Sequence, residues 1–223
     1  MTHRFKLAAI ALATAATIIA QAPTASASLI TNGSFEGIMN FVPNADDTMD
    51  LPNGSPAMTG WEVIANNVAW IGPTNPFGLA ASDGGYFLDL TSYNDSATFG
   101  GVTQSIATNV GSVYTLSFDI GGDPRYGLPS AITATAGLTS QTFGYSLAGN
   151  NIWETENLSF TATGPTTLIT LQGQSGIAYI GLDNVSANFV SDGSTPVPEP
   201  AGLALLGTGL LCIVALRRRS ASA

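Results

Sequence analysis

The residues of this chain that could do chemistry are carboxylates, hydroxyls, amides, aromatic rings and one central arginine. The single histidine, His3, and the single cysteine, Cys212, lie near the two ends of the 223-residue sequence, so residues 29–190 contain neither. Ser-His-Asp and Cys-His catalysis, histidine-bound zinc and redox dithiols each need an imidazole or a thiolate. These chemistries are therefore excluded from the middle of the chain, as is an intrachain disulfide.

The net charge limits the kinds of molecule that this chain can bind. The formal charge is −9, and residues 29–190 hold 13 acidic side chains against one basic side chain, Arg125. Binding to nucleic acid depends on neutralising phosphates with Lys and Arg. Such binding is excluded for this region, and docking on an anionic membrane surface is disfavoured.

Aromatic side chains are the candidates for binding a sugar, which needs a ring for C–H stacking and a few hydrogen-bonding groups in a concave site or loop. Trp61 and Trp70 lie in apolar runs and are predicted to fill the core. Tyr93, Arg125 and Tyr126 lie among Ser, Asn, Asp, Gly and Pro, which favours exposure. These three are the candidate ligand-binding residues.

Two polar features leave alternatives open. Arg125 could bind a sugar hydroxyl or a uronate, or it could pair with a nearby acid such as Asp123. Glu154 and Glu156 would share one face of a strand at i and i+2. Glycoside hydrolases use two carboxylates about 5 Å or about 6.5–9.5 Å apart, so a carboxylate-based hydrolase stays open as an alternative.

Short segments of alternating apolar and polar residues, separated by Gly, Pro, Asn and Asp turns, predict β-strands. Residues 29–190 are long enough for one domain with a full core. They are predicted to form an all-β, single antiparallel sandwich or barrel. The clearest strand signals are Tyr86–Leu90, Val113–Ile120, Asn157–Ala162, Thr167–Leu171 (apolar on both faces, as in a central strand) and Asp183–Phe189.

The N-terminal residues 1–27 have the pattern of a signal peptide. Basic residues precede an apolar run, Leu7–Ala20, and small residues at 25–27 suit cleavage after Ala27. The run is too short to span a bilayer comfortably.

The C-terminal residues 198–223 follow a linker at 191–197 and have three parts in order. A Pro-Glu-Pro triplet precedes an apolar run, Ala201–Leu216, and three arginines follow it. Sixteen residues make a helix of roughly 24 Å, marginal for a hydrocarbon core of about 30 Å, and the arginines favour retention on the cytoplasmic side. We predict a single transmembrane helix at 201–216. The motif residues are Pro198, Glu199, Pro200, Arg217, Arg218 and Arg219.

This tail resembles the PEP-CTERM sorting signal of Gram-negative bacteria. The resemblance implies recognition by exosortase, an intermediate anchored in the inner membrane, and a final place at the cell surface or in the extracellular matrix. It also implies an exopolysaccharide-producing, biofilm-forming organism.

A second resemblance covers nearly the whole middle of the chain. The motif order is similar to galactose-binding-like jelly-roll domains, above all to domain-of-unknown-function family six-forty-two and the related bacterial "choice-of-anchor" proteins. The chain departs from that pattern in the insert 38–59 and in lacking the cysteines of plant members. The family implies a carbohydrate- or cell-wall-binding module rather than an enzyme. The motifs are 32–36 (Asn-Gly-Ser-Phe-Glu), 60–61 (Gly-Trp), 83–90, 101–106, 114–122, 158–162 and 180–186.

The same resemblance implies a structural Ca²⁺ where the first and last strands meet, at positions matching Glu36 and Asp183. Ca²⁺ takes six to eight oxygen ligands, and no lysine in the domain could balance these acids. The alternative is that Glu36 is solvated in a turn and Asp183 accepts backbone N–H bonds. The cluster Asp46, Asp47 and Asp50, predicted to lie in a loop, lacks the glycine and distal glutamate of an EF-hand.

The sequence thus predicts an exported protein that exosortase sorts and whose non-catalytic domain binds extracellular polysaccharide. Two alternatives remain: a structural biofilm-matrix protein without a small ligand, and a carboxylate-based glycoside hydrolase.

Overall fold

The structure, a computed structural model, describes residues 27–93, 97–125, 129–145, 152–175 and 179–193. The predicted transmembrane helix, the sorting motif, Tyr126 and all but the last residue of the predicted signal peptide lie outside these ranges. Within them, no helix is long and apolar enough to cross a membrane. The elements are η1 (a 3-10 turn, Ile38–Asn40), β1 (Thr48–Leu51), β2 (Glu62–Ile64), β3 (Val68–Ile71), β4 (Phe87–Asp89), β5 (Gly101–Ala107), β6 (Val113–Gly122), β7 (Ala131–Ala136), β8 (Thr139–Gly144), β9 (Ile152–Thr161), β10 (Thr166–Ser175) and β11 (Gly181–Ser191).

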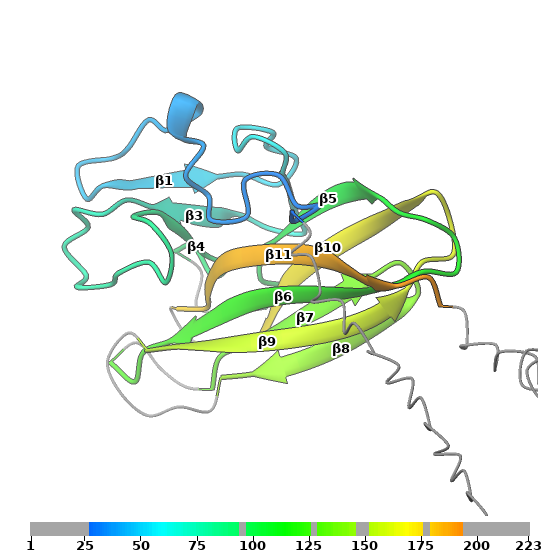
Figure 1. The fold of residues 1–223 in the computed structure, drawn as a ribbon. Helices are drawn as coiled ribbons and strands as arrows, with labels where there is room; N and C mark the ends of the chain where they lie inside the picture. The colour runs from blue at the N-terminus through cyan, green and yellow to red at the C-terminus, as the bar shows by residue number, and fades with distance from the viewer. Residues whose placement is uncertain (1–26, 94–96, 126–128, 146–151, 176–178, 194–223) are drawn as a thin grey trace, which may run out of the picture.

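The strands form two antiparallel sheets packed face to face (Figure 1). The six-stranded sheet has the order β1-β3-β4-β11-β6-β9, and the five-stranded sheet has the order β2-β5-β10-β7-β8. Neighbours in space are mostly distant in sequence, as in a jelly roll. The predicted all-β antiparallel jelly-roll sandwich is confirmed.

Alternation along single strands predicted their faces well. Tyr114, Leu116 and Phe118 of β6 point into the main core, and Val185 and Ala187 of β11 do the same. A strand whose side chains alternate must bury one set when one face packs on the other sheet. The prediction is confirmed for both strands.

The prediction that Thr167–Leu171 is a central strand is confirmed, but its outer face is exposed. The segment lies in β10, the middle strand of its sheet, but Leu168 is 55% exposed. The outer face of the five-stranded sheet is open to solvent at Leu168, whereas the inward residues Thr167, Ile169 and Leu171 are buried.

A β-bulge interrupts β11 next to Asp183. Asp183 is opposite Asp119 and Ser186 is opposite Ser117, so β11 has one residue more than β6 between these pairs. Asn184 takes up the extra position with φ of 50°. Because the bulge shifts the alternation by one residue, Asp183 lies on the outer face while Val185 returns to the core.

The six-stranded sheet is covered on its outer face by the segment 72–86. A second apolar cluster lies there, in which Leu79 and Phe77 of the segment pack with Phe87 and Tyr179. The Nε1–H of Trp153 donates to the carbonyl of Ala80 (2.9 Å) and ties the segment to β9. This cover explains why β3 and β4 are buried on both faces.

The insert 38–59 contributes an edge strand. It contains β1, which pairs with β3 and extends the six-stranded sheet. The prediction that Asp50 lies in a loop was wrong, because Asp50 is in β1, opposite Ala69. Asp46 and Asp47 lie in the turn that precedes the strand.

Candidate functional site

Asp183 is fully buried and holds the start of the loop 82–86. Its Oδ2 accepts the backbone N–H groups of Ser82 (2.8 Å) and Asp83 (3.0 Å), and its Oδ1 accepts that of Asn184 (2.7 Å). Burial raises the pKa of Asp183 to about 7, although these hydrogen bonds favour the charged form.

Glu36 holds the other end of the same loop. Its Oε1 accepts the backbone N–H groups of Gly85 and Tyr86, both at 2.7 Å. Between them, Gly84 has φ of 71°, and a Cβ there would collide with the Glu36 carboxylate. Two predicted site residues from opposite ends of the domain therefore meet at one loop, as anchors of its backbone.

Asp119 lies beside Asp183 on the neighbouring strand. The Ser82 hydroxyl is 2.7 Å from Asp119 Oδ2 and 3.2 Å from Asp183 Oδ2, so the two carboxylates share one donor. Thr155 Oγ1 donates to the other oxygen of Asp119 (2.6 Å). These hydrogen bonds link the loop 82–86 to β6, β9 and β11.

Calcium at Glu36 and Asp183 stays a prediction. The alternative drawn from the sequence for Asp183, acceptance of backbone N–H groups, describes the hydrogen bonds at this residue. In the ranges that the structure describes, no three His, Cys, Asp or Glu side chains are grouped so that they could hold a metal ion.

Tyr93 presents an exposed ring at the outer edge of the six-stranded sheet. The side chain is 59% exposed, and its hydroxyl lies 2.6 Å from Thr48 Oγ1 and donates to Asp46 Oδ2 (3.2 Å). Hydrogen bonds from Thr48 and from Tyr93 lower the pKa of Asp46, so this carboxylate is ionised at neutral pH. The ring is thus fixed at its polar end and open to solvent elsewhere.

Polar groups close to Tyr93 are held in place as well. The hydroxyl of Ser92 donates to Asp50 Oδ1 (2.5 Å), and the amide of Asn67 donates to Asp50 Oδ2 (2.8 Å). An exposed aromatic ring among ordered hydroxyl, amide and carboxylate groups is the combination that a sugar ring requires.

Arg125 pairs with Asp123, which was the second of the two alternatives for it. Its Nε donates to both oxygens of the fully buried Asp123 (3.1 and 2.9 Å), and Nη2 donates to Oδ2 (2.5 Å). The arginine side chain is 44% exposed. A ligand-binding role for Arg125 stays a prediction, and so does that of Tyr126, which lies outside the described residues.

Glu154 and Glu156 lie on the same face of β9, opposite Ile120 and Phe118 of β6. Burial, and then repulsion by Glu154, raise the pKa of Glu156. A raised pKa is what a general acid needs, and nothing in the sequence indicated it.

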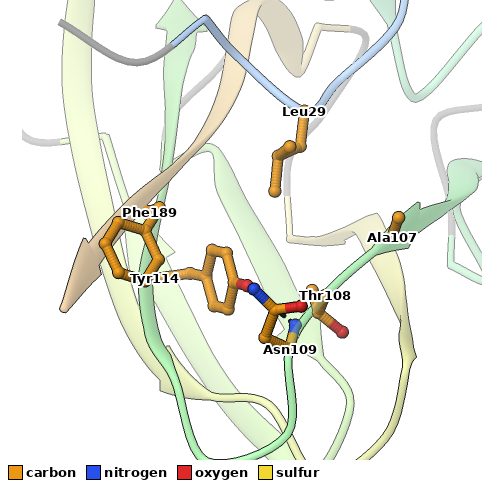
Figure 2. A pocket seen from close by; sticks show the side chains of 6 residues that line it. All are labelled: Leu29, Ala107, Thr108, Asn109, Tyr114 and Phe189. Atoms are coloured by element: carbon orange, nitrogen blue, oxygen red, sulfur yellow. Dashed lines mark hydrogen bonds between the residues drawn. The ribbon is translucent and has the colours of Figure 1, made fainter. Parts of the chain in front are cut away.

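A pocket of about 220 Å³ opens at the far end of the sandwich, between β5 and β11 (Figure 2). Sequence analysis placed Phe189 at the end of a predicted strand, Asp183–Phe189, but did not identify it as part of a site. No local signal could have done so, because the two strands belong to different sheets. The lining residues are Leu29, Ala107, Thr108, Asn109, Tyr114 and Phe189.

Residues 28–178 match the family model described as protein of unknown function, DUF642. The chain belongs to this family. Residues 196–219 of this DUF642 protein match the PEP-CTERM protein-sorting motif, which implies recognition by exosortase, export, and a membrane-anchored stage before surface sorting.

Solved structures with a similar fold include three carbohydrate-binding modules. TmCBM61, solved with β-1,4-galactotriose, is 16% identical with a TM-score of 0.46, and the match covers 74% of this chain and 100% of that chain. The CBM4 structure is 19% identical (TM-score 0.42; 72% and 99%). The xylan-binding CBM22-1 domain of Paenibacillus barcinonensis Xyn10C is 16% identical (TM-score 0.42; 67% and 99%). At these identities the likeness concerns the fold alone. No curated protein matches this DUF642 chain.

The pH dependence of stability tests the buried Asp183. Its pKa is about 7 in the folded protein and about 3.9 when unfolded, so the protonated form stabilises the fold. That contribution is complete below about pH 4 and is lost as the pH rises through 7. From pH 5 to 8 in EDTA, the free energy of unfolding in urea should fall by roughly 2 kcal/mol more in the wild type than in Asp183→Asn. Glu62→Gln, an exposed site with the same charge change, is the control. Equal falls in the wild type and Asp183→Asn would contradict the assignment.

Calcium is tested by thermal unfolding at pH 8. We expect millimolar CaCl₂ to raise the unfolding midpoint, EDTA to reverse the rise, and MgCl₂ to have a smaller effect because Mg²⁺ gives up its water less readily. Asp183→Asn and Glu36→Gln should both abolish the rise. If CaCl₂ does not change the unfolding midpoint of the wild-type protein, the calcium prediction is wrong.

Proposed function

We propose that this protein is an exported, non-catalytic binding module for extracellular polysaccharide. The observation that carries the proposal is the ring of Tyr93, exposed to solvent and fixed through its hydroxyl by Thr48 and Asp46. A ring held before binding loses little conformational freedom when a sugar stacks on it.

The surroundings of Tyr93 suit a polymer rather than a small, enclosed ligand. The ring stands at the edge of the sheet beside β1, and Asp50, also exposed, lies on the same side as Thr48. An open shelf of this kind leaves room for chain on both sides of the stacked sugar. Carboxylate and amide oxygens next to the ring accept hydrogen bonds from sugar hydroxyls.

The location follows from the sorting motif. Exosortase-dependent sorting of a chain whose motif follows residue 193 would leave the sandwich outside the inner membrane. We propose the cell surface or the extracellular matrix of a biofilm as its final place. A structural matrix protein without a small ligand is the alternative. It would associate with the matrix in a calcium-dependent way and would show no saturable sugar binding.

The carboxylate-based hydrolase is kept as a second candidate because the pKa of Glu156 is raised beside Glu154. Against it, neither glutamate lines the pocket between β5 and β11. We propose that burial at the edge of the sheet raises the pKa of Glu156 and that this side chain catalyses no hydrolysis.

Removing the ring of Tyr93 tests the proposed binding site. Retention on the host's own exopolysaccharide, and on insoluble cellulose and xylan, should weaken at least about tenfold in Tyr93→Ala, a loss of about 1.4 kcal/mol. Tyr93→Phe keeps the ring and loses its anchor, so it should retain part of the affinity. Leu138→Ala, at an even more exposed apolar site on the β7–β8 turn, is the control. The proposal fails if the wild-type protein is retained by no polysaccharide or if Tyr93→Ala binds unchanged.

A panel of chromogenic glycosides tests the non-catalytic part. We expect no turnover by the wild-type protein between pH 5 and 8, and no difference in Glu154→Gln or Glu156→Gln. Turnover that either substitution abolishes would establish the hydrolase instead.

A further inference from the structure

The pocket between β5 and β11 is built on a row of aromatic rings that crosses three strands. Phe189 of β11 and Phe160 of β9 lie on either side of Tyr114 of β6 in the strand register. The Tyr114 and Phe160 rings are stacked (centroids 5.5 Å apart), and Phe189 meets Tyr114 edge to face (5.8 Å). Phe189 is 40% exposed, whereas Tyr114 is buried. The row therefore ends in one accessible ring at the pocket wall.

Polar groups stand opposite this ring. The backbone N–H of Asn109 donates to the Tyr114 hydroxyl (2.9 Å), which leaves the proton of that hydroxyl for another acceptor. The Asn109 side chain is exposed and offers both a donor and an acceptor. Figure 2 shows Phe189 and Tyr114 on one side of the pocket, Ala107, Thr108 and Asn109 on the other, and Leu29 above them.

The lining carries no carboxylate and no basic side chain, although the domain around it has 13 acidic side chains. At about 220 Å³ the pocket is smaller than the roughly 300–1,000 Å³ of sites for drug-sized ligands, so it admits a group of one ring. One accessible aromatic ring, one phenol hydroxyl and one amide match a pyranose, which has apolar C–H faces and a hydroxyl edge.

We propose that this pocket is a second carbohydrate site, which takes the terminal pyranose of an uncharged glycan chain. The proposal rests on the proposed function for its ligand class, and it differs from the Tyr93 shelf in ligand form. The shelf stands at the edge of a sheet and suits the interior of a chain, whereas the pocket, at about 220 Å³, admits one ring and suits the end of a chain.

The two sites lie at opposite ends of the sandwich. Tyr93 follows β4, which pairs with the start of β11 at Gly181. Phe189 lies eight residues further along β11, roughly 27 Å away at about 3.4 Å per residue. Figure 1 shows β1, β3 and β4 at one end of the molecule and the end of β11 at the other. One molecule could then bind two chains and cross-link a polysaccharide network.

Saturation-transfer NMR on the purified exported protein tests the pocket, with the methyl β-pyranosides of glucose, galactose and N-acetylglucosamine as probes. At least one should bind to the wild type. Phe189→Ala should weaken that binding at least tenfold, and Tyr114→Phe should weaken it several-fold by removing one donor. Val190→Ala, the exposed neighbour of Phe189, is the matched control and should bind as the wild type does. Near-UV circular dichroism and thermal unfolding confirm that each variant is folded.

Cross-linking is measured by light scattering of a soluble polysaccharide that the protein retains. The wild type should increase the particle size, and both Phe189→Ala and Tyr93→Ala should abolish the increase, while Phe189→Ala still binds polymer through Tyr93. If no glycoside binds, or if Phe189→Ala binds all of them as the wild type does, the pocket proposal is overturned, and the Tyr93 result decides the proposed function separately. A dimer that Phe189→Ala dissociates in sedimentation, with no glycoside binding, would overturn it in favour of a contact between two copies.

Discussion

Hydrogen bonds from backbone N–H groups to carboxylates hold the loops of this domain to its sheets. Asp183 and Glu36 bind the loop 82–86, and Asp47 accepts the N–H and the hydroxyl of Thr74. Arg125 and Asp123 form the one salt bridge found in the described part of the chain. With 13 acids and a single base in residues 29–190, ion pairs cannot do this work. Charge-assisted hydrogen bonds are roughly twice as strong as neutral ones, so a few of them can order long loops.

Holding a loop with a buried carboxylate costs desolvation free energy, and Asp183 shows this cost. Burial raises its pKa to about 7 even though three backbone N–H groups favour the charged form. Desolvation outweighs the hydrogen bonds because the side chain has no exposed surface. The Ser82 hydroxyl lies within hydrogen-bonding distance of both Asp183 and Asp119.

The same kind of anchor orders the proposed binding site at the surface. Asp46 is ionised and accepts hydrogen bonds from Thr48 and from the Tyr93 hydroxyl. These bonds hold the exposed ring of Tyr93 in one position. The pocket at the other end uses uncharged groups instead: Tyr114 is fixed by ring stacking and by a backbone N–H. A domain with two ordered aromatic sites of different form at its two ends is suited to a matrix of polymer chains.

What the sequence determined by itself is what depends on neighbours along the chain: the strands of alternating residues, the burial of Trp61 and Trp70, and the exposure of Tyr93. It also determined the absence of imidazole and thiol chemistry between residues 29 and 190. Side chains in a strand alternate with a period of two whatever the sheet order, so these features are local. Only the tertiary structure decided which carboxylates meet. Asp183 bonds to Ser82 across 101 positions, and Thr48 bonds to Tyr93 across 45. Such contacts, and the pocket between strands of different sheets, follow from the order of strands in the two sheets and from a bulge at Asn184, which no spacing within one strand specifies.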